Sequence, residues 1–215
     1  MENLTIALTK GRLQDGAFEV FQKAKLPCQC LEQEASDRKL ILEDPGGGIR
    51  YVLAKGSDVI TYVEHGAADL GVVGLDTLME HGGQVYEILD LGIGKCNFAV
   101  AGFPDTVLTP GPRQIRIATK YPAVAGRYFK EKGLDASIIR IEGSVELAPL
   151  LGISDAIFDI VETGSTLKAN GLVVLEHVKE LSARLIVNMA SMKLKPEEIR
   201  VLVEKIWGTR SDRVD

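Results

Sequence analysis

The residues from Asp159 to Thr166 combine an acid and several hydroxyl groups at a spacing that could bind a phosphorylated sugar. Asp159 interrupts an almost continuous apolar run, from Ala156 to Val161, which is typical of a strand covered on both faces. A carboxylate in such a strand is costly to bury unless another group pairs with it. Its presence therefore favours a functional role for Asp159.

A turn rich in hydroxyls follows the apolar run and leads into a helix-like segment that starts at Leu167. Free backbone N–H groups, side-chain hydroxyls and the positive end of a helix dipole converge at such a turn, which makes it an anion site. The alternative is an ordinary helix cap, because Ser and Thr cap helices in any α/β protein. With Asp159 just before it, the turn favours a sugar phosphate: the carboxylate binds ribose hydroxyls and the turn binds the 5′-phosphate.

Lys10 and Arg12 place two cations at another predicted junction between a strand and a helix. The strand is expected over residues 4–8, and an amphipathic helix follows it. Ligands of open α/β sheets bind beyond the carboxyl ends of strands, so this placement suits a second anion site. A solvated loop with ordinary surface charge is the alternative.

A Gly-x-x-Asp pattern precedes two of the predicted strands. It occurs at Gly66 and Asp69, and again at Gly152 and Asp155. This echo suggests two related β-turn-α units, one in each lobe, with a ligand held between them. Asp76, at the helix start of the earlier unit, is either a cap or a ligand contact.

Composition excludes several classes of protein. The 215 residues are 46% hydrophobic and 26% charged, which is ordinary for a globular protein with one large domain or two small lobes. The net charge of −5 implies no general affinity for nucleic acid or anionic membranes. No apolar run approaches the roughly 18 residues of a membrane span, and the start lacks a secretory pattern. Three cysteines argue against a disulfide framework, so we expect a cytoplasmic protein.

Strand and helix patterns alternate through both halves of the chain, which predicts an α/β class with mixed, mostly parallel sheets. Lobe I is expected over residues 1–92 and 180–215, and lobe II over residues 93–179. The segment 181–189 is expected to be a strand or a long connection that returns to lobe I. The three histidines are predicted to be surface or capping residues rather than catalytic ones; they are His65, His81 and His177.

Five segments resemble the short form of ATP phosphoribosyltransferase, a family that catalyses the first step of histidine biosynthesis. The resemblance covers nearly the whole chain. Its segments are Ile6–Leu13, Val63–Gly74, Arg116–Tyr121, Gly143–Pro149 and Asp159–Leu167. The last two are the most specific, and the others support them by order and spacing.

This resemblance implies a fold like that of the two-lobed periplasmic binding proteins, with the active site in a cleft between lobes. It implies a pentosyltransferase in which N1 of the adenine of ATP attacks C1 of phosphoribosyl pyrophosphate. The products are N1-(5-phosphoribosyl)-ATP and pyrophosphate, and Mg²⁺ is the implied cofactor. Adenine N1 is unprotonated at neutral pH, so the reaction requires no strong general base.

The resemblance also implies roles for individual residues. The residues implied to bind phosphoribosyl pyrophosphate are Asp159, Glu162, Thr163, Gly164, Ser165 and Thr166. The positions that face the pyrophosphate and the ATP phosphates, taken as catalytic, are matched by Lys10, Arg12 and Arg38. Positions on the ATP side of the cleft are matched by Asp76 and Glu146. No residue is identified as a protein ligand of Mg²⁺.

Short forms of this family lack the C-terminal regulatory domain of the long form. The chain ends soon after Trp207, which leaves no room for that domain. The resemblance therefore implies a homodimer within a hetero-oligomer, with a separate regulatory subunit similar to a histidyl-tRNA synthetase. It implies no nucleic-acid or membrane partner.

Three other functions stay open at this point. A type I nucleobase phosphoribosyltransferase would carry two adjacent acids before its Thr-Gly loop, whereas Asp159 is followed by Ile160. A periplasmic-type solute receptor would share the fold, but the phosphate turn and the absent secretory pattern argue against it. A non-catalytic subunit would be revealed by the activity of the purified chain with and without a partner.

Overall fold

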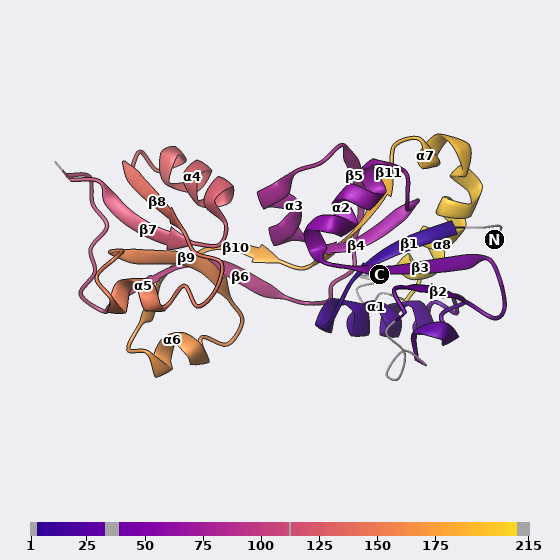
Figure 1. Ribbon diagram of the computed structural model, residues 1–215, viewed down its shortest axis with the longest axis horizontal. Helices are drawn as coiled ribbons and strands as arrows, with labels where there is room; N and C mark the ends of the chain where they lie inside the picture. Colours follow the sequence, from indigo (N-terminus) through magenta and orange to yellow (C-terminus); the bar gives the residue numbers. More distant parts are fainter. Residues whose placement is uncertain (1–3, 33–38, 112, 210–215) are drawn as a thin grey trace, which may run out of the picture. The chain divides into compact units, whose positions relative to one another are not determined.

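The computed structural model describes residues 4–32, 39–111 and 113–209, which form two compact units (Figure 1). The first unit takes its described residues from Met1–Leu78, Gly82–Gly94 and Ser182–Asp215. The second unit consists of Met79–His81 and Lys95–Leu181, again for the described residues. Each unit is built around one β-sheet.

The sheet of the first unit has the strand order β2-β3-β1-β4-β11-β5. Its strands are β1 (Leu4–Thr9), β2 (Ile41–Glu43), β3 (Ile49–Ala54), β4 (Leu70–Gly74), β5 (Val85–Asp90) and β11 (Ala183–Asn188). The strands β3, β1 and β4 run parallel, and the other pairings are antiparallel. The helices are α1 (Arg12–Lys23), α2 (Gly56–Glu64), α3 (Leu75–His81, whose end belongs to the second unit), α7 (Ser191–Leu194) and α8 (Pro196–Trp207), with a 3₁₀ turn at Gln29–Leu31.

The sheet of the second unit has the strand order β10-β6-β9-β7-β8. Its strands are β6 (Cys96–Gly102), β7 (Ile115–Thr119), β8 (Ala136–Arg140), β9 (Ala156–Val161) and β10 (Val173–Leu181). The strands β8, β7 and β9 run parallel, whereas β6 pairs antiparallel with both β9 and β10. The helices are α4 (Pro122–Glu131), α5 (Leu147–Leu150) and α6 (Ser165–Ala169).

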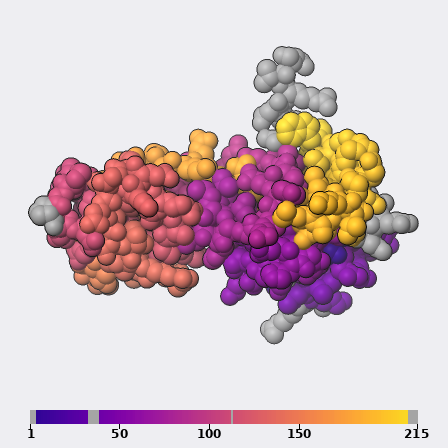
Figure 2. Space-filling view, turned by 90° about the horizontal axis from the view of Figure 1, so that it is seen from above, coloured from indigo at the N-terminus to yellow at the C-terminus, as the bar shows by residue number. Residues whose placement is uncertain are grey.

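Apolar alternation along the strands builds a core on each side of the first sheet. Ile6 and Leu8 of β1 lie in one buried cluster with side chains of α1 and α8, while Ala7 lies in another with side chains of α2. This is the two-residue period expected of a strand between two helical layers. The helices α7 and α8 are the yellow segments at the surface of this unit in Figure 2.

The second sheet is covered in the same way, and its alternation sets the direction of Asp159. Ile157 and Val161 of β9 lie in a buried cluster with side chains of α5 and α6. Phe158 lies on the other face, where its ring packs against the α4 rings of Tyr128 and Phe129. Asp159 shares the face of Ile157 and Val161 by the two-residue period, so its carboxylate belongs to the side of the sheet covered by α5 and α6.

The α/β class with mixed sheets is confirmed. Among the strand pairings of the described residues, four of nine are parallel, and they form the centre of the first sheet and one side of the second. The segment that was expected to be a strand or a connection forms β11, which inserts between β4 and β5 of the first sheet. The links from β5 to β6 and from β10 to β11 contain no helix, and the strands that they join take part in the antiparallel pairings.

The two Gly-x-x-Asp segments have equivalent structural roles at the amino-terminal edges of the parallel strands. Asp69 precedes β4, and its carboxylate accepts a hydrogen bond of 2.9 Å from the backbone N–H of Thr5 on β1. Asp155 precedes β9, and its carboxylate accepts one of 2.8 Å from the backbone N–H of Arg116 on β7. Each acid thereby ties two parallel strands together where their pairing begins.

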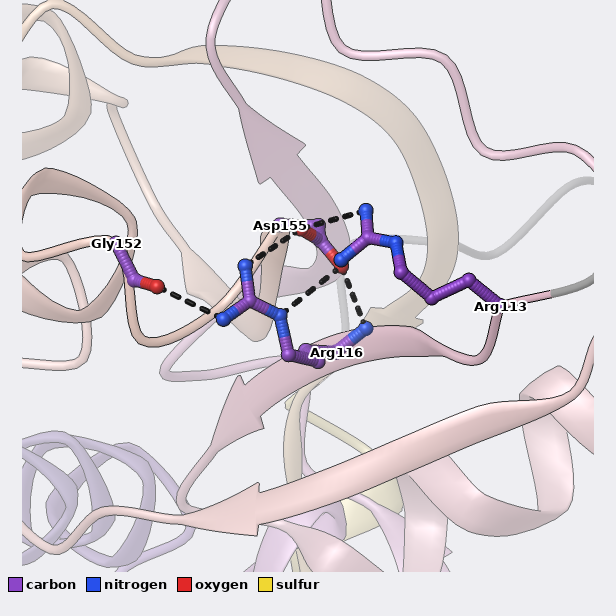
Figure 3. Close-up of polar contacts among 4 residues, drawn as sticks. All are labelled: Arg113, Arg116, Gly152 and Asp155. Carbon is purple, nitrogen blue, oxygen red and sulfur yellow. Dashed lines mark hydrogen bonds and ion pairs between the residues drawn. The ribbon is translucent and has the colours of Figure 1, made fainter.

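Both acids also form ion pairs with basic side chains. The Asp69 carboxylate also accepts from Ser191 Oγ at 2.7 Å and forms an ion pair with Lys195 at 2.8 Å. The Asp155 carboxylate forms ion pairs with Arg116 at 2.8 Å and Arg113 at 3.2 Å (Figure 3). The Arg116 hydrogen bonds lower the pKa of Asp155 to about 2. The echo in the sequence therefore reflects a shared structural requirement at an edge that lies opposite the carboxyl ends of these strands.

Candidate active site

In each unit, the predicted site residues that the structure describes lie beyond the carboxyl ends of the parallel strands, where α/β proteins bind ligands. We call the residues that follow β1, β3 and β4 the first-sheet edge, and those that follow β7, β8 and β9 the second-sheet edge. The second-sheet edge contains Asp159, the turn from Glu162 to Thr166, and Glu146. The first-sheet edge contains Lys10, Arg12 and Asp76.

Asp159 is a partly buried acid without an ion pair to any other described residue. Its Oδ1 accepts a hydrogen bond of 2.8 Å from the backbone N–H of Ile160. Burial raises the pKa of Asp159 to about 6, with a further upward contribution from the charge of Glu146 and an opposing one from Lys120. A carboxylate with this pKa is ionised at neutral pH and can accept hydrogen bonds from ligand hydroxyls.

The turn after β9 presents hydroxyl groups to solvent. The hydroxyls of Thr163 and Ser165 lie 3.0 Å apart, and the backbone N–H of Ser165 donates to Thr163 Oγ1 at 3.4 Å. Gly164 takes a left-handed conformation with φ of 71°, which favours glycine. Thr166 is exposed, whereas Leu167 is buried and holds the turn against the core.

The helix after this turn differs from the sequence-based expectation. It starts at Ser165 rather than Leu167 and contains only five residues. The first N–H groups of a helix, here those of Ser165 and Thr166, have no hydrogen-bond partner within the helix. A five-residue helix has a weak dipole, so anion binding here depends on the hydroxyl and N–H groups themselves.

Glu146 lies in the turn before α5, on the covered face to which Asp159 belongs. The charge of Glu146 contributes to the raised pKa of Asp159, as expected for two acids at the same edge of the sheet. Lys120, the first residue after β7, acts on Asp159 as well. Sequence reasoning missed Lys120, although Lys10 follows β1 at the same place and could have indicated it.

The first-sheet edge places two exposed cations at the start of α1. Lys10 follows β1, its backbone N–H donating to the carbonyl oxygen of Ala54 at 3.0 Å. Arg12 is the first residue of α1, and its side chain is exposed. Arg38, the third predicted cation, lies outside the described residues.

Asp76 lies in the first turn of α3, and Thr77 Oγ1 donates to its carboxylate at 3.2 Å. A Cβ atom on Gly74 would lie 2.1 Å from Asp76 Oδ1. Glycine at this position therefore leaves room for the carboxylate to lie beside the end of β4. This close approach is a local feature of the first unit, separate from the acids of the second.

A cavity of about 450 Å³ lies elsewhere in the first unit. Its lining residues are Leu4, Thr5, Glu43, Asp44, Gly47, Gly48, Ile49 and Arg50. None of the predicted site residues is among them. The cavity lies at the start of β1, away from the carboxyl end where Lys10 follows.

Comparisons with known proteins agree on one family. The family model described as HisG, ATP phosphoribosyltransferase, matches residues 55–208. An ATP phosphoribosyltransferase of Clostridium kluyveri is 53% identical over 203 residues, covering 94% of this chain and 92% of that protein. An ATP phosphoribosyltransferase of Clostridium acetobutylicum is 52% identical over 205 residues, covering 95% of this chain and 94% of that protein.

Two solved structures resemble the fold. The ATP phosphoribosyl transferase (HisG:HisZ) complex from Thermotoga maritima matches with a TM-score of 0.79 and 32% identity, covering 96% of this chain and 97% of that one. The VFT2 domain of Bordetella pertussis BvgS matches with a TM-score of 0.59 and 10% identity, covering 97% of this chain and 88% of that one. The second likeness concerns the fold alone, and the predicted periplasmic-binding-protein-like class is confirmed.

Proposed function

The chain belongs to the ATP phosphoribosyltransferase family, and from this premise we propose that Asp159 and the turn from Glu162 to Thr166 bind phosphoribosyl pyrophosphate. The family reaction is the first step of histidine biosynthesis and belongs to the pentosyltransferase class. A lone pair on N1 of the adenine of ATP forms a bond to C1 of the ribose. The bond from C1 to the pyrophosphate oxygen breaks, and its electrons leave with the pyrophosphate.

One observation carries this assignment: Asp159 is a partly buried carboxylate without an ion pair to another described residue, just before a turn rich in hydroxyls. A sugar phosphate offers hydroxyl donors to the acid and anionic oxygens to the turn. The Asp159 carboxylate binds ribose hydroxyls, while the hydroxyl and N–H groups of the turn bind the 5′-phosphate.

Cations are proposed to stabilise the pyrophosphate leaving group. As the bond to pyrophosphate breaks, negative charge grows on the leaving group and positive charge grows on the ribose. Lys10 and Arg12 are exposed cations at the carboxyl end of β1, and with Arg38 they are proposed to stabilise the pyrophosphate and the phosphates of ATP. Asp76 and Glu146 are proposed to contact ATP, with their carboxylates accepting hydrogen bonds from the nucleotide.

Mg²⁺ is the proposed cofactor. Among the described residues no group of three or more His, Cys, Asp or Glu side chains is arranged to hold a metal ion. Proteins commonly bind Mg²⁺ through one or two carboxylates together with substrate phosphates. The ion would neutralise negative charge on the pyrophosphate, and Glu162 at the second-sheet edge would supply a carboxylate near it.

A regulatory partner is proposed from the family and from one solved relative. The Thermotoga maritima structure is a HisG:HisZ complex that matches nearly the whole of this chain. We therefore propose that this chain, as a homodimer, joins a separate histidyl-tRNA-synthetase-like subunit in a hetero-oligomer. Within the described residues no helix is long and apolar enough to span a membrane. A cytoplasmic location remains part of the proposal.

The family match decides between the alternative functions. The family model spans residues 55–208, which include Asp159 and the hydroxyl turn, so a nucleobase phosphoribosyltransferase is not supported. The likeness to BvgS reaches 10% identity and gives no reason to propose solute reception. Activity of the purified chain, measured with and without a HisZ-like subunit, tests the remaining alternative of a non-catalytic subunit.

Steady-state kinetics test the proposed binding site. We expect Asp159→Asn and Thr166→Ala to raise KM for phosphoribosyl pyrophosphate about 10- to 100-fold and to change KM for ATP less than about threefold. Asp105→Asn and Thr109→Ala are matched controls, because both residues are exposed in the loop after β6. Equal increases in the two KM values, or none, would contradict the placement of the sugar phosphate.

A further inference from the structure

Lys120 is an exposed cation at the second-sheet edge to which neither the sequence patterns nor the family comparison assigns a role. It directly follows β7, which pairs in parallel with β9. The pairing ends with Thr119 beside Phe158, and Lys120 and Asp159 are the residues that directly follow this last pair in the two segments. The chain order of β7 and β9 thus brings a cation alongside the proposed ribose-binding acid.

The face of the sheet agrees with this register. Ala118 and Ile157, two residues before Lys120 and Asp159, both lie in the buried cluster covered by α5 and α6. By the two-residue period of strands Asp159 continues the row of Ile157, and Lys120, the first residue after β7, follows Ala118 at the same spacing. The charge of Lys120 also acts on Asp159, where it opposes the effect of Glu146.

The charges at this edge leave Lys120 available for a ligand. Arg140, at the end of β8, is already paired with Glu142 at 2.7 Å. Within residues 4–32, 39–111 and 113–209, the Lys120 side chain has no ion-pair or hydrogen-bond partner. An anionic substrate that approaches Asp159, Glu146 and Glu162 meets like charge, and a cation beside these acids reduces that repulsion.

We propose that Lys120 is a further substrate-binding residue, whose ammonium group contacts a phosphate oxygen of phosphoribosyl pyrophosphate while Asp159 holds the ribose. The inference rests on the proposed binding of that substrate at the second-sheet edge. An ammonium group on a flexible stem suits this role, because it supplies three donors and a compact charge to phosphate oxygens. The same contact would offset the repulsion between the substrate and Glu146.

Kinetics of Lys120→Met test the contact, since methionine keeps most of the stem and removes the charge. We expect KM for phosphoribosyl pyrophosphate to rise about 10- to 100-fold, with KM for ATP changed less than about threefold. Lys120→Arg restores the charge and should recover at least part of the loss. Lys130→Met is the matched control, because Lys130 is an exposed lysine on α4 of the same unit, and it should match the wild type.

Inhibition by fragments of the substrate then identifies the end that Lys120 contacts. Ribose 5-phosphate carries one end and inorganic pyrophosphate carries the other. Weaker inhibition of Lys120→Met by either fragment supports the inference and assigns the contact to that fragment. Unchanged inhibition by both fragments overturns it, as does a Lys120→Arg enzyme that is no better than Lys120→Met.

Asp159→Asn, measured alongside, separates this inference from the proposed function. If Asp159→Asn raises KM for phosphoribosyl pyrophosphate and Lys120→Met does not, the binding site stands and the role of Lys120 is wrong. If neither substitution raises it, the placement of the substrate is wrong and both fall. Thermal melting of each variant shows that the kinetic effects belong to folded protein, and Lys120→Gln repeats the test with a polar side chain.

Discussion

Asp159→Asn should make the protein more stable at neutral pH while it weakens substrate binding. Burial raises the pKa of Asp159 from 3.8 to about 6, so the ionised acid is less favourable in the folded protein than in the unfolded chain. Each pKa unit corresponds to about 1.4 kcal/mol, so ionisation of Asp159 costs the folded state about 3 kcal/mol at neutral pH. Asparagine removes this charge and keeps an oxygen that can accept from the Ile160 N–H.

The stability gain from Asp159→Asn should depend on pH. Because the folded-state pKa lies above that of the unfolded chain, the destabilisation is absent below about pH 4 and complete above about pH 6. The gain from Asp159→Asn should therefore reach about 3 kcal/mol at pH 7.5 and disappear at pH 3.5. In a chain of this size the gain corresponds to about 6–12 °C in Tm.

Urea unfolding of the wild type and Asp159→Asn at the two pH values measures the effect. Asp105→Asn, which removes an exposed carboxylate from the same unit, should change the free energy of unfolding by less than about 0.5 kcal/mol. A variant less stable than the wild type at pH 7.5, or a gain that is the same at both pH values, would refute the assignment of Asp159 as an acid held at an energetic cost. A stability gain with weaker substrate binding is the trade-off expected of a functional residue.

Three further outcomes are expected. KM for phosphoribosyl pyrophosphate should rise about tenfold between pH 7.5 and pH 5 as Asp159, with its pKa of about 6, becomes protonated; a flat profile from stopped-time assays would contradict its binding role. Asp155→Ala should lower the free energy of unfolding by about 1–2 kcal/mol at pH 7, since the N–H of Arg116 loses its acceptor. The pKa of Asp155 is lowered to about 2, so this difference should vanish in urea titrations as pH falls from about 4 to about 2; a difference that persists would exclude the ionised acid as its source. Gly74→Ala should leave the urea midpoint nearly unchanged but raise KM for ATP, because its Cβ displaces only the movable carboxylate of Asp76; an unchanged KM would argue against Asp76 as an ATP contact.

Local sequence was sufficient to predict the elements that carry the proposed site. The apolar run from Ala156 to Val161 forms β9, and the glycine turn with its hydroxyls follows directly, because these features depend on neighbours along the chain. The family was recognisable for the same reason, since its motifs are continuous segments. The positions of Lys10 and Arg12 after β1 were likewise predictable from strand and helix patterns.

The fold decided the meaning of the repeated Gly-x-x-Asp segments. Their spacing suggested two related units with a ligand between them, but it did not predict what the two acids contact. Asp69 and Asp155 accept hydrogen bonds from backbone groups of Thr5 and Arg116, which lie 64 and 39 residues away along the chain. Sequence periodicity contains no information about which distant backbone group an acid will meet.

By itself, then, the sequence determined the strands, the hydroxyl groups of the turn and the family, because each of these depends on residues that are contiguous in the chain. Only the tertiary structure decided that Lys120, Glu146 and Asp159 share one edge, and that β11 returns to separate β4 from β5. The physical reason is strand register. Pairing of β7 with β9 joins residues 39 positions apart, and that choice depends on packing across the whole sheet rather than on any local pattern.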